Sequence, residues 1–158
     1  MTFRSEAAKC DPVQSWNRPE RAFFAAGACH ILADAFLRRF SASSFRAVLI
    51  HPHNAGRGSH VFVSDGNTVF DYHGFSSHAH FIRFYFRHLQ RRFPGWQADL
   101  IPLSDPPASA EFCRRYQHRE PSQFLRDPMA RAEAFLSHLL AKPSPHSVLR
   151  RALASSHC

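Results

Sequence analysis

The sequence predicts a single α+β domain in which a helix packs on a small antiparallel sheet and further helices flank it. Its 158 residues have the usual size of one domain, and 44% of them are apolar, which opposes wholesale disorder. Two patterns support this class: apolar residues at helical spacing over 28–40, and two apolar runs joined by Asp-Gly at 65–66.

The first elements follow from prolines and from apolar spacing. Pro12 and Pro19 interrupt any helix near the start, so we expect residues 1–18 to form an irregular N-terminal arm. Over 28–40, apolar side chains recur every three or four residues, after Gly27 and before a Ser-rich turn. We therefore expect the first helix over this range.

Three strands are expected next. Residues 45–50 and 60–63 are rich in apolar and β-branched side chains, and a segment with two glycines separates them as a loop. Asp65-Gly66-Asn67 then forms a hairpin turn, because Asp-Gly between two apolar runs favours that structure. The third strand covers 68–72.

The second half of the chain adds more helices than strands. We expect an amphipathic helix over 78–93, a strand over 98–103, a short helix over 108–118 and a helix that begins at Asp127-Pro128 and ends near 140. The folded domain then covers residues 19–142, and residues 143–158 form a C-terminal tail.

Basic residues outnumber acidic ones by 20 to 12, which gives a net charge of +8 and a pI near 10.2. Such a surface attracts anions and fits an acidic partner. We expect no nucleic-acid partner, because no nucleic-acid-binding motif is present. Residues 1–9 lack a signal-peptide stretch and no run of about 18 apolar residues occurs, so we expect a cytoplasmic protein without a membrane span.

The cysteines indicate free thiols. No CxxC spacing occurs among the four of them, at positions 10, 29, 113 and 158. This pattern is typical neither of a zinc ribbon nor of a dense disulfide framework. We therefore expect no disulfide, no metal site and no other cofactor.

One of these thiols lies where a nucleophile is favoured. Cys29 falls in the first turn of the expected helix, where unpaired backbone N–H groups and the positive end of the helix dipole stabilise an anion. The pKa of a thiol there can fall well below the free value of about 8.5, and the same amides can hold an oxyanion. Cys29 is therefore a candidate nucleophile, although a free cysteine is more often a small core residue.

A histidine and an aspartate follow Cys29 in chain order. His60 begins one expected strand, and Asp71 lies near the end of its hairpin partner. Counting around the Asp-Gly turn places 60 and 71 near one rung of the ladder, so that their side chains can meet. Nucleophilic catalysis by cysteine needs such a base, oriented by a carboxylate.

This order resembles the papain-like superfamily, in its circularly permuted and transglutaminase-like branches. The resemblance rests on three short segments within residues 20–75, namely Gly27-Ala28-Cys29-His30, His60-Val61-Phe62-Val63 and Val69-Phe70-Asp71-Tyr72-His73-Gly74. It implies a papain-like core over residues 19–142, with Cys29 as nucleophile, His60 as base and Asp71 as orienting acid.

An oxyanion hole needs at least two donors. The backbone N–H of Cys29 is one candidate, and the side chain of Gln14 or Asn17 is the candidate for the second. These two are the only amide side chains shortly before the cysteine.

Two further histidines lie beside the candidate triad in the sequence. His30 points about 100° around the helix from Cys29, where Asp34 at i+4 can pair with it, so we expect a structural role. His73 lies two residues beyond Asp71 and can assist or replace that acid.

A Cys-His-Asp triad predicts a cysteine hydrolase or acyltransferase that forms a thioester acyl-enzyme with a protein or peptide substrate. Peptidase, amidase, deamidase and transglutaminase activities remain open, because either water or an amine can resolve such an intermediate. A small basic domain of this kind also fits a bacterial toxin or effector.

The alternative is a noncatalytic binding protein. Arg83, Arg87 and Arg91 recur every four residues on the expected helix over 78–93, which gives that helix a basic stripe. This stripe is the candidate anion-binding surface for an acidic partner or a nucleic acid. A fast-alkylating cysteine near neutral pH separates the enzyme from the binding protein.

Overall fold

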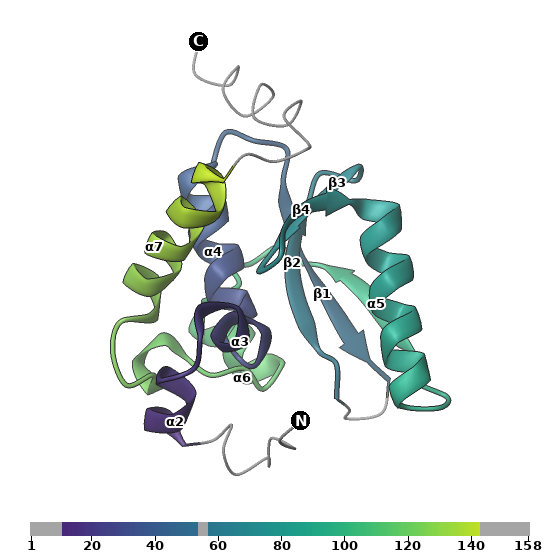
Figure 1. The fold of residues 1–158 in the computed structure, drawn as a ribbon, viewed down its shortest axis with the longest axis horizontal. Coiled ribbons are helices and arrows are strands. Elements are labelled where there is room, and N and C mark those ends of the chain that lie inside the picture. The colour runs from purple at the N-terminus through teal and green to yellow at the C-terminus, as the bar shows by residue number, and fades with distance from the viewer. Residues whose placement is uncertain (1–10, 54–56, 143–158) are drawn as a thin grey trace.

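A five-stranded antiparallel sheet forms the centre of the protein in a computed structural model that describes residues 11–53 and 57–142 (Figure 1). The strand order is β4-β3-β2-β1-β5. The strands are β1 (Arg46–Pro52), β2 (His60–Ser64), β3 (Thr68–Asp71), β4 (Gly74–Ser77) and β5 (Ala98–Pro102). The predicted α+β class with an antiparallel sheet is thus confirmed.

Helices cover both faces of this sheet (Figure 1). One face carries a single long helix, α5, and the other carries a layer built around α4 and α7. The helices are α2 (Pro12–Trp16), α3 (Glu20–Ala25), α4 (Cys29–Arg39), α5 (His78–Arg92), α6 (Ala110–Arg115), the 3₁₀ turn η1 (Pro121–Gln123) and α7 (Pro128–Ala141). Among the described residues, no helix combines the length and apolarity needed to cross a bilayer.

The period-two alternation of the central strand divides the core into two clusters. Val61 and Val63 of β2 pack toward α4, whereas Phe62 packs toward Phe81 of α5. Because both faces are covered, every residue of β2 and β3 is buried. A polar side chain at the end of either strand is therefore held in a fixed, dry environment.

The helix that presents Cys29 is fixed by its neighbours. Helix α4 is buried along its first eight residues, and Phe36 and Leu136 of α7 belong to the same cluster. Phe24 of α3 stacks on Phe135 of α7 with ring centroids 5.0 Å apart. Gly27, at φ +121°, makes the turn between α3 and α4 that only glycine adopts without strain.

The prediction of an irregular arm over 1–18 is wrong for residues 12–16, which form α2. Pro12 occupies the first helical position, where its missing N–H costs nothing, and the Asp11 carboxylate accepts a hydrogen bond from the Gln14 N–H at 2.8 Å. Helix α3 and strand β4 were also not expected, because α3 follows Pro19 without a side-chain cap and β4, Gly-Phe-Ser-Ser, has no run of apolar residues. The predicted tail at 143–158 lies outside the described residues.

Candidate active site

Cys29 is the first residue of α4, and its side chain is 6% exposed. The N-cap residue, Ala28, has no side chain that can accept the N–H groups of the first turn. The sulfur therefore sits at the positive end of an uncapped helix. Its Sγ also accepts a hydrogen bond from the backbone N–H of Val61 at 3.4 Å, which ties the helix to β2.

His60 and Asp71 are in contact, as the sequence predicts. The Nε2–H of His60 donates to Oδ2 of Asp71 at 3.2 Å, and each side chain is 3% exposed. The observed register of β2 and β3 differs from the predicted one, however. Phe70 lies opposite Val63, so one more step would put Asp71 opposite Phe62, and the contact with His60 is diagonal across the ladder.

The thiol reaches His60 through an opening beside β2. Strand β3 pairs with β2 only at Val63 and Ser64, so the β3 side of the first half of β2 has no ladder partner. Cys29 approaches there from the α4 face, whereas His60 packs under α5. Because Nε2 of His60 is bound to Asp71, Nδ1 is the ring nitrogen that meets the thiol.

The environment of Cys29 favours the thiolate. Burial raises the pKa of this thiol, but hydrogen bonds with His118, His30 and His60, together with the charge of His60, hold the pKa well below its ordinary value. The three imidazoles thus lower the pKa of the thiol by more than burial raises it. The buried thiol is an anion in a pH range where an ordinary cysteine is protonated.

The pKa values of His60 and Asp71 are shifted in the directions that keep both residues charged beside the thiolate. Burial lowers the pKa of His60, but the hydrogen bond to Asp71 and the contact with Cys29 raise the pKa to about 9. Burial likewise raises the pKa of Asp71, but hydrogen bonds from His60 and His73 hold the pKa well below its usual range. The site therefore holds a thiolate, an imidazolium and a carboxylate.

His73 contacts the acid, as expected for an assisting residue. Its backbone N–H donates to Oδ1 of Asp71 at 2.8 Å, and its ring Nδ1 lies 3.4 Å from the same carboxylate. The ring itself is 58% exposed. His73 therefore contacts Asp71 from the solvent side. It does not replace Asp71 as the hydrogen-bond partner of His60.

Two tyrosines enclose the His60 ring and were not predicted. Tyr85 of α5 stacks on it with centroids 5.4 Å apart and planes 12° apart, and Tyr72 packs edge-on. The Tyr85 hydroxyl donates to the Gly58 carbonyl at 3.1 Å, and burial raises the pKa of both phenols, that of Tyr72 to about 12. In the sequence, Tyr85 is one of several aromatic residues on a helix, and nothing there indicates its position over His60.

A cleft of about 1200 Å³ opens beside Cys29. Three arginines, Arg57, Arg115 and Arg119, and two histidines, His51 and His118, contribute to its lining. The remaining lining residues are Ala25, Ala26, Gly27, Cys29, Pro52, Gly58, Ser59, Tyr85, Tyr116, Gln117 and Gln123. Since none of these is acidic, the cleft has a positive potential.

The expected second oxyanion donor is not at this site. Gln14 in the middle of α2 and Asn17 at its C-cap are both exposed, and neither contributes to the cleft lining. Arg131 holds this helix in place by donating to the Trp16 carbonyl. The side chains of Gln14 and Asn17 therefore do not lie in the described cleft, and α2 contacts a cleft residue through Ser15, whose Oγ accepts a hydrogen bond from Arg119 at 3.1 Å.

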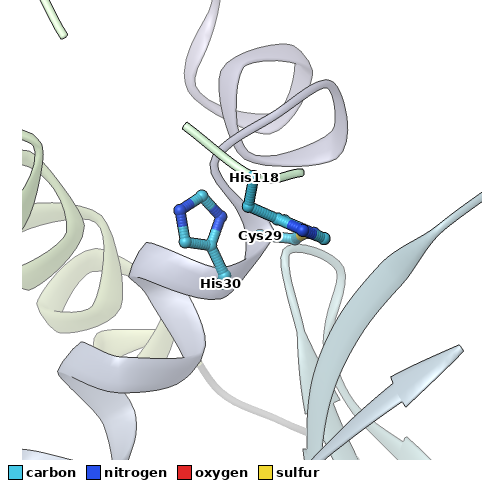
Figure 2. A group of neighbouring side chains, drawn as sticks. All are labelled: Cys29, His30 and His118. Atoms are coloured by element: carbon cyan, nitrogen blue, oxygen red, sulfur yellow. The ribbon is translucent and has the colours of Figure 1, made fainter. Parts of the chain in front are cut away.

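His30 is buried beside Cys29, but it does not pair with Asp34. Its Nε2–H donates to the Arg119 carbonyl at 2.9 Å, whereas Asp34 accepts from Arg38 at 2.5 Å. His118, from the loop after α6, also comes close to the sulfur (Figure 2). No local sequence pattern indicates His118, because it reaches Cys29 only through tertiary packing.

The basic stripe lies away from the cleft. Arg83, Arg87 and Arg91 are exposed on α5, and none of them contributes to the lining beside Cys29. Phe84 interrupts this surface and is 60% exposed. The stripe and the Cys29 cleft are therefore separate surfaces.

No family model, curated protein or solved structure matches this chain. We therefore argue its function from the side chains around Cys29.

Proposed function

We propose that the protein is a papain-like cysteine hydrolase or acyltransferase, with Cys29 as nucleophile, His60 as base and Asp71 as the group that orients the base. The observation that supports this most is the buried His60–Asp71 hydrogen bond of 3.2 Å next to a thiol at the start of a helix. A core cysteine would not need an imidazolium and a carboxylate, because burying charged groups is costly.

The chemistry follows from the ionised groups. The Cys29 thiolate attacks the carbonyl carbon of an amide or thioester, and the N–H groups in the first turn of α4 stabilise the oxyanion. His60 gives its proton to the leaving group, and Asp71 keeps the ring in the required tautomer. A thioester acyl-enzyme results.

His60 then activates the second reactant. As a neutral imidazole it takes a proton from water or from an amine, which attacks the thioester and releases Cys29. Water gives peptidase, amidase or deamidase activity, and an amine gives transglutaminase activity. The cleft is large enough for a segment of a protein or peptide substrate.

Selective alkylation tests this proposal. At pH 6 with a metal chelator present, iodoacetamide should modify Cys29 much faster than Cys113, whose pKa burial raises to about 11. The His60→Ala variant should lose this selectivity, and Cys29→Ala should abolish acyl transfer while the melting temperature stays close to that of the wild type. Peptide mapping by mass spectrometry identifies the modified cysteine.

The opposite result favours the noncatalytic binding protein. If Cys29 reacts no faster than Cys113 at pH 6, and Cys29→Ala lowers the melting temperature by several degrees, Cys29 is a core residue. The exposed arginines of α5 would then be the surface to test with acidic partners.

A further inference from the structure

Two histidines beside Cys29 have no part in the proposed triad. His30 and His118 both lie beside the sulfur, and one ligand atom from each of Cys29, His30 and His118 lies within 4.8 Å of the others (Figure 2). The three residues come from the start of α4 and from the loop after α6. We call them the Cys-His-His cluster.

The tautomer of each histidine is fixed by a backbone carbonyl. The Nε2–H of His30 donates to the Arg119 carbonyl at 2.9 Å, and the Nδ1–H of His118 donates to the Tyr116 carbonyl at 3.0 Å. A neutral His30 therefore has its lone pair on Nδ1, and a neutral His118 has its lone pair on Nε2. Metal-binding histidines commonly have this arrangement, with the second N–H held by a carbonyl.

The Nδ1 atom of His30 is an independent indication of a ligand. His30 is 0% exposed, and Nδ1 makes no hydrogen bond within the described part of the chain apart from its approach to the thiol. This atom lies on the side of the ring that faces Cys29 and His118 (Figure 2). When the ring proton is on Nε2, Nδ1 carries only a lone pair and cannot donate to the Cys29 thiolate, and a metal ion in the cluster would satisfy that lone pair.

We propose that Cys29, His30 and His118 bind a zinc ion, with the fourth coordination position open to the cleft. One thiolate and two imidazoles are ligands that Zn²⁺ prefers, and three protein ligands with one open position is a common zinc geometry. Zinc bonds of about 2.0–2.3 Å place ligand atoms roughly 3.3–3.7 Å apart. The cluster, at 4.8 Å or less, needs to close by about 1 Å. The sequence predicts no metal site, because no CxxC spacing occurs and His118 lies far along the chain from Cys29 and His30.

Zinc binding and catalysis exclude each other. When the ion binds, a lone pair of the Cys29 thiolate forms the Zn–S bond and a water molecule leaves the hydrated ion, so that Cys29 cannot attack a carbonyl. No oxidation or reduction takes place. This exclusion rests on the proposed function, whereas zinc binding itself does not.

Metal titration of the untagged full chain tests the site directly. Co²⁺ should give the near-ultraviolet thiolate-to-cobalt charge-transfer band, and Zn²⁺ should displace it. His118→Gln should weaken Zn²⁺ binding roughly tenfold or more and reduce this band, since a ligand is lost. His118 is partly exposed, so this variant is expected to fold, and circular dichroism checks it.

The matched control is His51→Gln. His51 lines the same cleft and packs its ring against Tyr116, but it is outside the cluster, so its removal should leave the affinity for Zn²⁺ unchanged. Equal affinities of His118→Gln and the wild type, or a cobalt complex without the thiolate band, would overturn the proposed site.

A further pair of measurements separates this proposal from the proposed function. Zn²⁺ should slow alkylation of Cys29, and a chelator should restore it, whether or not the protein is an enzyme. His60→Ala should lose acyl transfer and retain Zn²⁺ binding. Zinc that binds without protecting Cys29 from alkylation would contradict the proposal, whereas protection in a protein without acyl-transfer activity would support the zinc site and refute the proposed function.

Discussion

The charge of the His60 ring depends mainly on Asp71. Burial lowers the pKa of the imidazole, but the hydrogen bond from Nε2–H to the Asp71 carboxylate at 3.2 Å, together with the contact with Cys29, raises the pKa to about 9, compared with about 6.5 for a free histidine. His73 acts one step further away, because its hydrogen bonds go to the Asp71 carboxylate and not to the His60 ring. The two residues should therefore differ in their effects on catalysis.

The pH profile of acyl transfer tests this difference. In the wild type, with a chelator present, kcat/KM should fall as pH rises through about 9, because the imidazolium that protonates the leaving group is lost. Asp71→Asn should move this alkaline limb to lower pH and reduce kcat by orders of magnitude, since the burial of His60 then favours the neutral ring. His73→Asn should change both quantities much less.

The control is Asp99→Asn. Asp99 is also an aspartate bound to a histidine, His53 at 3.0 Å, but it is exposed on β5. Its removal should not shift the pH profile. The assignment of Asp71 is wrong if His73→Asn moves the alkaline limb and Asp71→Asn leaves it in place.

For single residues, the sequence predicts contacts within the site where short connections link the residues. Cys29, His60 and Asp71 could be grouped because one helix start and one hairpin turn determine their relative positions. The diagonal contact differs from the predicted rung because the pairing of β3 is shifted by two residues. Tyr85 and His118 could not be predicted, since they reach the site from separate elements through packing alone.

The start of α4 depends on the conformation of a single glycine. Gly27 has φ +121°, and a Cβ atom built there would meet nothing within 4 Å. A side chain at this position would therefore have space but not a permitted backbone conformation.

Gly27→Ala should lower the free energy of unfolding by about 1–3 kcal/mol through backbone strain. Because Cys29 follows two residues later, the same change should also slow the alkylation of Cys29 at pH 6. Urea denaturation followed by circular dichroism measures the first effect, and mass spectrometry measures the second. Unchanged stability would show that the turn before α4 does not require a positive φ.

Among the elements, an apolar pattern with a recognisable cap or turn decides what the sequence predicts. Helix α5 and helix α7 lie within two residues of their expected ends, because each is long enough to show an apolar period and begins at an N-cap, Ser77 or Asp127. The ends of strands β1, β2, β3 and β5 also lie within two residues of their expected positions. The short elements α2, α3 and β4 depend on caps and tertiary contacts that leave no period.

The net charge of +8 is not spread evenly around the proposed active site. Arg57, Arg115 and Arg119 line the cleft beside Cys29, and no acidic residue within 11–53 or 57–142 does. Fields of one sign within a cleft attract ligands of the opposite charge. Peptides with acidic side chains should therefore be preferred over basic ones.

Measuring kcat/KM for acidic and basic versions of one peptide tests this preference. The ratio should fall toward one as salt is raised from about 0.05 to 1 M, because the Debye length shrinks to about 3 Å. Arg115→Gln, within the cleft, should reduce the preference at low salt. The control Arg83→Gln, on the exposed face of α5, should leave it unchanged, and equal effects of the two variants would show a general charge effect instead.

The hydrogen bond between the Val61 N–H and the Cys29 sulfur links the proposed acylation of Cys29 to the packing of α4 on β2. The sulfur occupies a place beside β2 where a neighbouring strand would supply a carbonyl oxygen, and it accepts the Val61 N–H at 3.4 Å. A thioester sulfur is a poorer acceptor than a thiolate, so each acylation weakens this link between helix and sheet. The Val61 amide should then exchange its hydrogen faster in the acyl-enzyme than in the resting state, so that one backbone proton reports how far each catalytic cycle has advanced.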